Sequence, residues 1–460
     1  MKLNKYTHIY LIGIGGIGMS ALARYFNKKE GVNIFGYDKN RSELCIKLEL
    51  EGIKISYNEL LDEKINKLKE LKNKALVIYT PAISSDNVIL KYFRKHNFDI
   101  MKRSEVLGCI SQNIYTIAIA GTHGKTTTAT ILSHILYSCG KQLTAFFGGI
   151  SKNYNSNLIN MKNSELLVVE ADEYDKSFLE INADIAIITS LDADHLDVYK
   201  NKNNFYKAFI QFSKQIKKEG VLLVEKSISN IFSAPKNGIK LTYSAVEKAD
   251  YYCKNIFYSE GNTHYNFFNN YVKSPTSLIT CALPGLHNIS NSIAAISIAS
   301  FLGIKMHDIS SAMLCFKGIS RRFDIQINKK NIAYIDDYAH HPKEVSETIK
   351  TAKNYFPNRE ITVVFQPHLF SRTNDFASDF ALSLSLANNI ILLNIYPARE
   401  KPMKGVDSEM LLNLCTSKNK EICKKENLIK LLEKKDIDVL LTLGAGDIST
   451  LVKPIKHLLN

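Results

Sequence analysis

An apolar run in the first third of this chain leads into a glycine-rich loop that contains a lysine, and this pattern limits the possible folds. Residues 114–128 read IYTIAIAGTHGKTTT. This pattern predicts a buried strand over Ile114–Ala120, a loop with Gly121 and Gly124, and a helix over Thr126–Cys139. Backbone N–H groups at a helix N-terminus bind phosphate, and glycines let the backbone approach it closely. The segment therefore predicts an α/β protein with a nucleotide-phosphate site.

The side chains of this loop have separate expected roles. Lys125 should bring positive charge to the terminal phosphates, and the Thr126 hydroxyl should ligate Mg²⁺. A standard phosphate loop has another glycine five residues before Gly124, where this chain has Ile119, so the loop is a shortened form, G-x-x-G-K-T. The expected ATP contacts of the loop are Gly121, Thr122, His123, Gly124, Lys125, Thr126 and Thr127.

A second glycine loop follows the apolar run His8–Ile12, and its glycines are Gly13, Gly15, Gly16 and Gly18. The spacing matches G-x-G-x-x-G, which places a diphosphate at a helix N-terminus. Asp38 follows twenty residues after Gly18, where an acidic ribose contact would lie. NAD, FAD and a nucleotide-diphosphate sugar all fit this pattern, and residue chemistry does not separate them.

Strands and helices are predicted to alternate in three successive segments, which is typical of doubly wound α/β sheets. The first segment has expected strands at His8–Ile12, Val32–Tyr37 and Ala75–Tyr79, and expected helices at Met19–Lys29, Arg41–Glu51 and Asp86–Lys95. After the phosphate loop, the second has strands at Leu166–Glu170, Ile185–Thr189 and Val221–Glu225, smaller β structure over 226–280, and helices at Asn288–Phe301 and Asp308–Phe316. The third opens after Arg322, with strands at Ile332–Ile335, Ile361–Phe365, Ile390–Asn394 and Asp438–Leu443.

Two polar clusters end strands of the second segment: residues 166–175 read LLVVEADEYD, and residues 185–197 read IAIITSLDADHLD. Residues at the carboxyl ends of such strands project into the ligand crevice. Glu170 is the first charge after four apolar residues, and we expect it to hold Mg²⁺ at the phosphates. His195 is expected to ligate a second cation or to orient phosphate.

Composition excludes several classes of protein. No apolar run approaches the roughly 18–20 residues that span a bilayer, so we expect no membrane insertion and a cytoplasmic location. The eight cysteines have no paired or metal-finger spacing, and most should be reduced. The formal charge of +14 is spread along the chain and not gathered into a basic–aromatic stripe, so we expect no nucleic-acid partner.

The ordered motifs of the whole chain resemble those of the Mur ligase family. They are GIGGIGMSALA (13–23), GYD (36–38), YTPAISSDN (79–87), RSE (103–105), GTHGKTTT (121–128), EADEYDKSFL (170–179), DADHLDVY (192–199), LPGLHNISNSIAA (283–295), GISRRFD (318–324), IDDYAHHPKEV (335–345), FQPHLFSRT (365–373), IYPAREKP (395–402) and GAGDI (444–448).

This resemblance implies an architecture and an activity. The expected domains are a Rossmann-like UDP-binding domain (1–112), a central phosphate-loop ATPase domain (113–323) and a Rossmann-like C-terminal domain (324–460). The implied reaction is ATP-dependent ligation of L-alanine to the lactyl carboxylate of UDP-N-acetylmuramate through an acyl phosphate, with Mg²⁺, in peptidoglycan synthesis. The alternative is the cell-wall recycling ligase that attaches a preformed tripeptide to the same sugar nucleotide. We expect a monomer or homodimer.

The resemblance also implies site residues. The first glycine loop, Asp38 and Arg103 would then hold the sugar nucleotide instead of NAD. Thr126, Glu170 and His195 correspond to metal ligands, and Lys125, His195 and Arg322 to catalytic residues. Further ATP contacts are His287, Asn291, Arg322 and Asp337, and the amino-acid side is lined by His341, His368 and Arg372.

The chain departs from relatives at three positions. Leu369 and Asn374 stand where many relatives have arginine, which leaves Arg372 as the cation of that stretch for the carboxylate of L-alanine. Ile210 stands where several Mur ligases carry a carbamylated lysine, and the L-alanine-adding branch resembles this chain in lacking it. We do not assign that role to Lys207.

Overall fold

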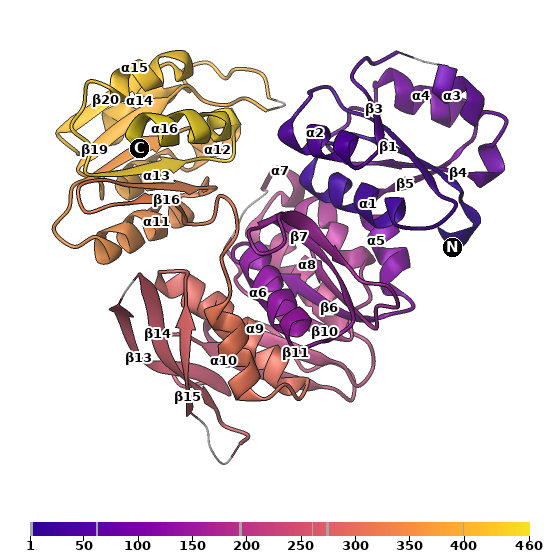
Figure 1. Ribbon diagram of the computed structural model, residues 1–460, viewed down its shortest axis with the longest axis horizontal. Coiled ribbons are helices and arrows are strands. Elements are labelled where there is room, and N and C mark those ends of the chain that lie inside the picture. The colour runs from indigo at the N-terminus through magenta and orange to yellow at the C-terminus, as the bar shows by residue number, and fades with distance from the viewer. Residues whose placement is uncertain (1–2, 61–62, 193–195, 260, 273–275, 399) are drawn as a thin grey trace. The chain divides into compact units, whose positions relative to one another are not determined.

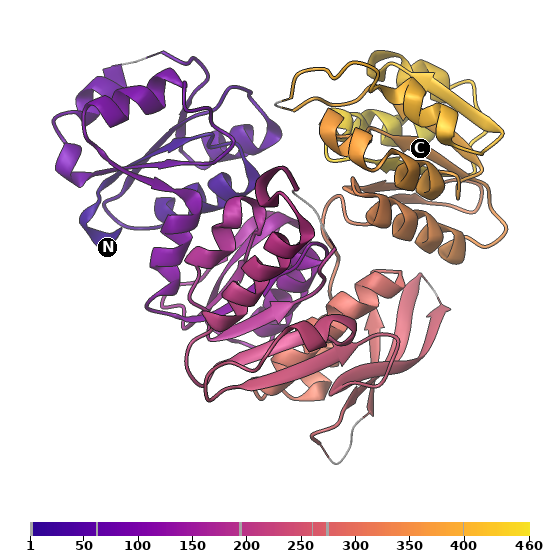
Figure 2. The same cartoon turned by 180° about the vertical axis from the view of Figure 1, so that it is seen from behind.

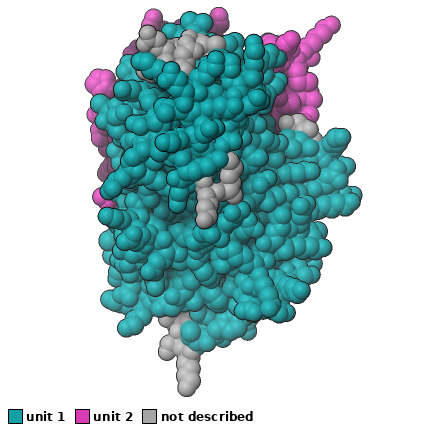
Figure 3. Space-filling model, turned by 90° about the vertical axis from the view of Figure 1, so that its right-hand side faces the viewer, with its two compact units in different colours: residues 1–254, 266–278, 290–316 teal, residues 255–265, 279–289, 317–460 magenta. Residues whose placement is uncertain are grey.

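The computed structural model describes residues 3–60, 63–192, 196–259, 261–272, 276–398 and 400–460. They form two compact units, coloured separately in Figure 3. Unit 1 comprises Met1–Lys254, Asn266–Leu278 and Ser290–Phe316, and unit 2 comprises Asn255–Tyr265, Ile279–Ile289 and Lys317–Asn460.

The N-terminal sheet has five strands in the order β3-β2-β1-β4-β5, all parallel. Its strands are β1 (His8–Ile12), β2 (Asn33–Tyr37), β3 (Lys54–Ser56), β4 (Ala75–Tyr79) and β5 (Asp99–Lys102). The helices of this region are α1 (Ile17–Asn27), α2 (Glu43–Leu50), α3 (Glu63–Leu68), α4 (Val88–Lys95) and α5 (Arg103–Ser111). Strand order reverses at β1, and ligands of open α/β sheets bind at such a point. The first glycine loop therefore begins at the sheet's switch point.

The central sheet has ten strands in the order β15-β14-β13-β12-β11-β10-β6-β9-β7-β8 (Figure 1). They are β6 (Tyr115–Ala120), β7 (Leu143–Ser151), β8 (Ser156–Asn160), β9 (Leu166–Glu170), β10 (Ile185–Ile188), β11 (Val221–Glu225), β12 (Ile239–Ser244), β13 (Tyr251–Ser259), β14 (Asn262–Asn269) and β15 (Thr276–Cys281). The helices are α6 (Lys125–Ser138), α7 (Leu196–Tyr199), α8 (Lys202–Lys214), α9 (Leu286–Phe301) and α10 (Met306–Leu314). Strand β6 runs parallel to both of its neighbours, β9 and β10. The phosphate loop thus also starts at a switch point.

The central sheet is covered on both faces: α6 faces the viewer in Figure 1, and α8 lies on the opposite face, seen in Figure 2. On the α8 side, Phe205 and Phe209 join a buried core that also contains Leu22 and Phe26 of α1. Burial of this shared apolar surface ties the N-terminal sheet to the central one within unit 1.

The C-terminal sheet has six strands in the order β16-β17-β21-β18-β19-β20. Only β16 runs antiparallel, against β17, and the other pairs are parallel. Its strands are β16 (Asp324–Asn328), β17 (Ala333–Asp337), β18 (Ile361–Phe365), β19 (Asn389–Leu393), β20 (Asn419–Cys423) and β21 (Val439–Leu443). The helices are α11 (Pro342–Tyr355), α12 (Phe370–Asp375), α13 (Ala377–Leu384), α14 (Ser408–Leu414), α15 (Leu428–Leu432) and α16 (Val452–Leu459), and six short 3-10 helices occur along the described chain.

The α/β class and the three-part architecture predicted from sequence are confirmed. Strands β1, β4, β9, β11 and β18 have the predicted bounds, and the polar stretch 226–280 contains strands β12 to β15 as expected. The domain boundaries after residues 112 and 323 stay predictions. Each of the eight cysteines is a free thiol, and no helix in the described ranges is both long and apolar enough to cross a membrane.

Candidate nucleotide site

The phosphate loop joins the end of β6 to the start of α6. Gly121 and Gly124 have φ values of +135° and +83°, which side chains with a Cβ rarely adopt. A Cβ on Gly121 would overlap the Thr189 hydroxyl, and one on Gly124 would overlap the Asn291 amide. Both glycines are therefore required by backbone conformation and by space. Gly124 caps α6, so the first N–H groups of that helix face the loop.

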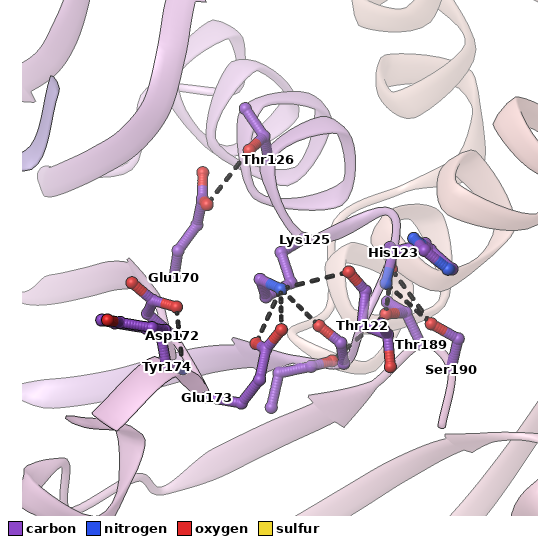
Figure 4. Close-up of polar contacts among 12 residues, drawn as sticks. Thr122, His123, Lys125, Thr126, Glu170, Asp172, Glu173, Tyr174, Thr189 and Ser190 are labelled. Carbon is purple, nitrogen blue, oxygen red and sulfur yellow. Dashed lines mark hydrogen bonds and ion pairs between the residues drawn. The ribbon is translucent and has the colours of Figure 1, made fainter. Parts of the chain in front are cut away.

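Residues just after β10 hold the loop in place (Figure 4). The Thr122 hydroxyl donates to the Asp192 carbonyl at 2.7 Å, and the His123 amide donates to the Ser190 hydroxyl at 2.8 Å. The Thr189 hydroxyl donates to the His123 carbonyl at 2.5 Å. The ring Nε2 of His123 lies 3.4 Å from the Asp192 carboxylate. These contacts fix the loop before any ligand arrives.

The Lys125 ammonium lies inside the loop and pairs with Glu173. Its Nζ donates to the two carboxylate oxygens at 2.7 and 3.0 Å, and to the carbonyls of Gly121 and Thr122 at 2.5 and 3.3 Å (Figure 4). Burial alone lowers the pKa of Lys125, but the charge of Glu173, followed by that of Asp172, outweighs burial and raises this pKa above its ordinary value. The lysine is therefore held charged within the phosphate loop.

Thr126 and Glu170 supply oxygen ligands at the same place. The Thr126 hydroxyl lies 3.1 Å from one carboxylate oxygen of Glu170, and the Gly148 amide donates to the other at 2.5 Å. A hydroxyl and a carboxylate are hard oxygen donors, and Mg²⁺ is held in proteins by few such ligands together with waters and phosphate. This donor set fits Mg²⁺. His195, the third predicted ligand, lies outside the described residues, and the described residues contain no group of three or more His, Cys, Asp or Glu able to hold a metal.

Asn291 is the other predicted ATP contact that reaches this loop. It lies on α9, is 7% exposed, and its side-chain oxygen accepts from the Thr128 hydroxyl at 3.4 Å. Its amide also lies against Gly124. His287, predicted to act with it, belongs to unit 2, where its ring lies beside Gly285.

The first glycine loop follows β1 and leads into α1. Gly13 has φ +83°, and the Gly15 amide donates to the Asp38 carboxylate at 2.8 Å. A Cβ on Gly15 would come within 2.5 Å of Cys45 Sγ, and one on Gly18 within 2.6 Å of Arg103 Nη1. The residues predicted to bind the sugar nucleotide therefore lie together. Asp38, expected to contact the ribose, binds the loop's own amide in this structure.

Arg103 links this loop to the strand that carries Glu170. Its Nη2 donates to the Asp172 carboxylate at 3.1 Å, and the neighbouring Lys102 pairs with Asp175 at 2.8 Å. Both carboxylates follow β9 in the acidic segment 170–175. Asp172 and the next residue, Glu173, thus connect Arg103, beside the first glycine loop, and Lys125 of the phosphate loop to one segment of unit 1.

In unit 2, Asp337 ends β17 and is almost fully buried. Its carboxylate accepts from the amides of Phe323 and Ala339 at 2.7 and 2.8 Å. Burial raises the pKa of Asp337 to about 6, although the Arg322 charge and the two amides act in the opposite direction. The Arg322 guanidinium lies 5.0 Å from the centre of the Tyr338 ring, a cation–π distance.

Arg321, next to Arg322, has a different environment. Its φ is +63°, its Nε donates to Asp336 at 3.0 Å, and its Nη2 donates to the Gly444 carbonyl at 2.5 Å. Asp336 is fully buried. These contacts make Arg321 a structural anchor of the C-terminal sheet.

The residues predicted for the amino-acid side share one region of unit 2. His341 caps α11, with Glu344 closing the capping box. The His368 ring lies 6.2 Å from His340 and stacks on Tyr396 at 5.7 Å. Burial lowers the pKa of His340 to about 3. The charge of Glu344 acts to raise this pKa, whereas the charges of Arg372 and His368 lower it further. His340 is thus neutral here.

Arg372 and the two atypical positions lie on or beside α12. Arg372 is 7% exposed, Asn374 is exposed, and Leu369, which precedes the helix, has φ +73°. On α8, Ile210 packs against the core of unit 1, while Lys207 is exposed to solvent. The exposure of Lys207 gives no reason to assign it the role of a carbamylated lysine.

The predicted ATP residues are divided between the two units. Lys125, Thr126, Glu170 and Asn291 lie together in unit 1, whereas His287, Arg322 and Asp337 belong to unit 2. That both sets act on one ATP molecule stays a prediction.

Sequence reasoning missed several residues that build the site. Glu173 pairs with Lys125 of the phosphate loop, and Asp172 pairs with Arg103 beside the first glycine loop. Ser190 and Asp192 hold the phosphate loop. The available signal was position: all four directly follow β9 or β10, whose carboxyl ends flank the loop.

Comparison with known proteins gives the family. Models of the "Mur ligase family, catalytic domain", the "Mur ligase middle domain" and the "Mur ligase, glutamate ligase domain" match residues 8–115, 119–299 and 321–446. The UDP-N-acetylmuramate–L-alanine ligase of Cytophaga hutchinsonii is 41% identical over 461 residues, covering 100% of this chain and 98% of that protein. The Flavobacterium psychrophilum protein of that name is 45% identical, with 99% of each chain covered.

A solved structure agrees with these relatives. The UDP-N-acetylmuramate-alanine ligase of Thermotoga maritima superposes with a TM-score of 0.82 at 27% identity, covering 98% of each chain. The three-sheet fold and the phosphate loop define a nucleotide-dependent enzyme. The chain belongs to the Mur ligase family, and it is therefore a ligase.

Proposed function

We propose that this enzyme joins L-alanine to the lactyl carboxylate of UDP-N-acetylmuramate at the expense of ATP, as a cytoplasmic step of peptidoglycan synthesis. The observation that carries the proposal is the phosphate loop with its charged Lys125 and its Thr126–Glu170 oxygen pair. Relatives that align over nearly their whole length, 41% and 45% identical, are named for this reaction. The names of these relatives suggest the substrates, and the phosphate loop is the proposed binding site of ATP.

The first glycine loop is the proposed site of the sugar nucleotide. Its amides and the N-terminus of α1 suit a diphosphate, and Arg103 beside Gly18 adds positive charge. Gly13, Gly15, Gly16 and Gly18 let a diphosphate approach the backbone closely. To bind the ligand directly, the Asp38 carboxylate would have to release the Gly15 amide. Otherwise Asp38 would hold that amide in place beneath the diphosphate.

Thr126 and Glu170 would hold Mg²⁺, and His195 is proposed as a further ligand. When bound, the metal neutralises charge on the phosphates that meet Lys125. Asn291 and His287 are proposed to contact adenine, Asp337 the ribose and Arg322 the γ-phosphate. His341, His368 and Arg372 are proposed to line the site of L-alanine, with Arg372 binding its carboxylate.

The proposed reaction has two steps. An oxygen of the lactyl carboxylate attacks the γ-phosphorus of ATP, the bond to the β-phosphate oxygen breaks, and ADP leaves. The amine of L-alanine then attacks the acyl carbon and loses a proton to the solvent, and the C–O bond to phosphate breaks to leave an amide and inorganic phosphate. A carboxylate resists direct attack because oxide is a poor leaving group, whereas phosphate leaves readily. The residues mainly position the reactants and stabilise charge, with Lys125 and Arg322 at the transferred phosphoryl group.

Oxygen tracing tests the acyl phosphate. If the lactyl carboxylate of UDP-N-acetylmuramate carries ¹⁸O, the released phosphate must contain one oxygen from that carboxylate. Mass spectrometry of the phosphate after reaction with ATP and L-alanine measures this transfer. Release of phosphate without ¹⁸O, together with formation of the alanyl product, would rule out the acyl-phosphate route.

A further inference from the structure

Neighbouring carboxylates in the acidic segment after β9 pair with different partners. Asp172 pairs with Arg103 at 3.1 Å, and Asp175 pairs with Lys102 at 2.8 Å. Glu173 instead turns into the phosphate loop and pairs with Lys125 at 2.7 Å. Its side chain is 2% exposed, whereas those of Asp172 and Asp175 are 40% and 38% exposed. Among these three acids, only Glu173 serves the phosphate loop from a buried position.

The backbone around Glu173 is tightly held. Asp175 and Lys176 are both left-handed, with φ values of 53° and 56°, and the Lys176 amide donates to the Glu173 carbonyl at 3.0 Å. The buried Tyr199 hydroxyl donates to the same carbonyl at 2.5 Å. Two consecutive left-handed residues are unfavourable unless the surroundings impose them. The segment is therefore built to present the Glu173 side chain in one direction.

The hydrogen bonds of Lys125 limit how a phosphate can reach it. An ammonium has three N–H donors, and here they meet the Glu173 carboxylate and the carbonyls of Gly121 and Thr122. A phosphate oxygen must replace one of these acceptors. Separating a buried carboxylate from its ammonium costs more than exchanging one neutral carbonyl for a charged phosphate oxygen. The exchange therefore takes place on the carbonyl side.

We propose that Glu173 is a positioning residue for Lys125, which stays paired with it while a nucleotide phosphate oxygen replaces one of the Gly121 and Thr122 carbonyls. Glu173 then keeps the ammonium directed at the phosphates throughout the cycle. The inference rests on the proposed binding of ATP at this loop, and it does not depend on which acceptor the enzyme uses.

Glu173→Gln tests this role because glutamine keeps the shape and removes the charge. Without that charge, the hydrogen bonds that direct the Lys125 ammonium are weakened. We expect the affinity for ADP near neutral pH to fall about tenfold or more, since a hydrogen bond to a charged group is lost. Calorimetric titration with ADP and Mg²⁺ measures this affinity.

Two controls separate positioning from general damage. Adenosine lacks phosphates, so its affinity should be the same in the variant and in the parent enzyme. Asp175→Asn removes a carboxylate two residues away that pairs with Lys102 and not with Lys125, and asparagine tolerates the left-handed backbone there. It should leave the affinity for ADP unchanged.

If Glu173→Gln does not fold, Glu173→Asp keeps the charge but withdraws it from Lys125, and its ADP affinity should fall by less. Unchanged or tighter ADP binding would overturn the proposal, because the carboxylate would then either have no effect on phosphate binding or compete with it. A loss of affinity shared by adenosine would also overturn it, in favour of a purely structural role. These titrations stand even if L-alanine proves not to be the acceptor.

Discussion

The Thr126 hydroxyl lies 3.1 Å from the Glu170 carboxylate, although 44 residues separate the two in sequence. Thr126 belongs to the first turn of α6, and Glu170 is the last residue of β9. Because β9 pairs in parallel with β6, its carboxyl end lies beside the loop that leads into α6. The topology of the sheet thus builds the oxygen pair proposed to hold Mg²⁺.

Glu170→Gln should increase the Mg²⁺ concentration that ATP turnover requires. Loss of a charged oxygen ligand should lower the turnover rate by about a hundredfold at limiting Mg²⁺ and raise the Mg²⁺ concentration needed for half-maximal rate. Phosphate release measured over a Mg²⁺ series checks this. Glu165→Gln, an exposed acid just before the other end of the same strand, is the matched control and should behave as the parent enzyme. If the rate depended on Mg²⁺ in the same way in both variants, Glu170 would not be a ligand of the metal.

Lys125→Ala should destabilise the enzyme as well as inactivate it. Removing the ammonium leaves the Glu173 carboxylate, 2% exposed, without that partner, and breaking a buried pair costs about 3 kcal/mol or more. The double variant Lys125→Ala with Glu173→Gln should recover a large part of that loss in thermal unfolding while remaining inactive. Additive destabilisation by the two substitutions would show that the pair contributes no coupling.

Gly15→Ala should separate the two ligand sites. The added Cβ would come within 2.5 Å of Cys45 Sγ and 2.9 Å of an Asp38 carboxylate oxygen, so the loop must shift. Overpacking of this size should lower the affinity for UDP-N-acetylmuramate by about tenfold or more and leave ADP affinity unchanged. Cys45→Ala in the same chain should restore part of the loss. An equal loss of affinity for both ligands, measured by calorimetry, would contradict the assignment of the two ligands to separate glycine loops.

Asp337→Asn should change how stability depends on pH. The folded pKa of about 6 lies above the ordinary 3.8, so between these values the folded chain binds more protons than the unfolded chain, and the contribution of Asp337 to stability falls as pH rises through this window. Above about pH 6 the ionised form carries a penalty of about 3 kcal/mol, which neutral asparagine lacks.

The stability of Asp337→Asn relative to the parent should therefore improve by up to about 3 kcal/mol between about pH 4 and pH 7. Unfolding of the full-length chain at several pH values measures this difference. Asp436→Asn, at an exposed position, should show no comparable trend. A constant difference across pH would mean that Asp337 ionises normally in the folded chain.

The sequence was sufficient to predict many of the central strands because burial on both faces gives them continuous apolar runs, as in Ala75–Tyr79 and Ile361–Phe365. It did not predict the interior strand β7. It also did not predict β3, β5, β8, β16 or β20, which lie at sheet edges and carry polar residues. Edge strands face solvent on one side, so their sequences resemble those of loops.

The same limit applies to the site. The loop glycines, Lys125 and Glu170 follow from a strand–loop–helix pattern that a sequence displays directly. The partner of Lys125 could not be predicted in this way, because the segment EADEYD contains four acids. Its left-handed turn at Asp175 and Lys176 decides which of them faces the loop. Contacts between the N-terminal and central sheets, such as Arg103 with Asp172, depend on packing that no local pattern encodes.

Phosphate release in the presence of ATP, Mg²⁺ and UDP-N-acetylmuramate, with L-alanine or the cell-wall tripeptide added in turn, shows which acceptor the enzyme uses. We expect release with L-alanine, dependent on both co-substrates, and an alanyl product of matching mass. Release with the tripeptide but not with L-alanine, or release that does not require the sugar nucleotide, would contradict it.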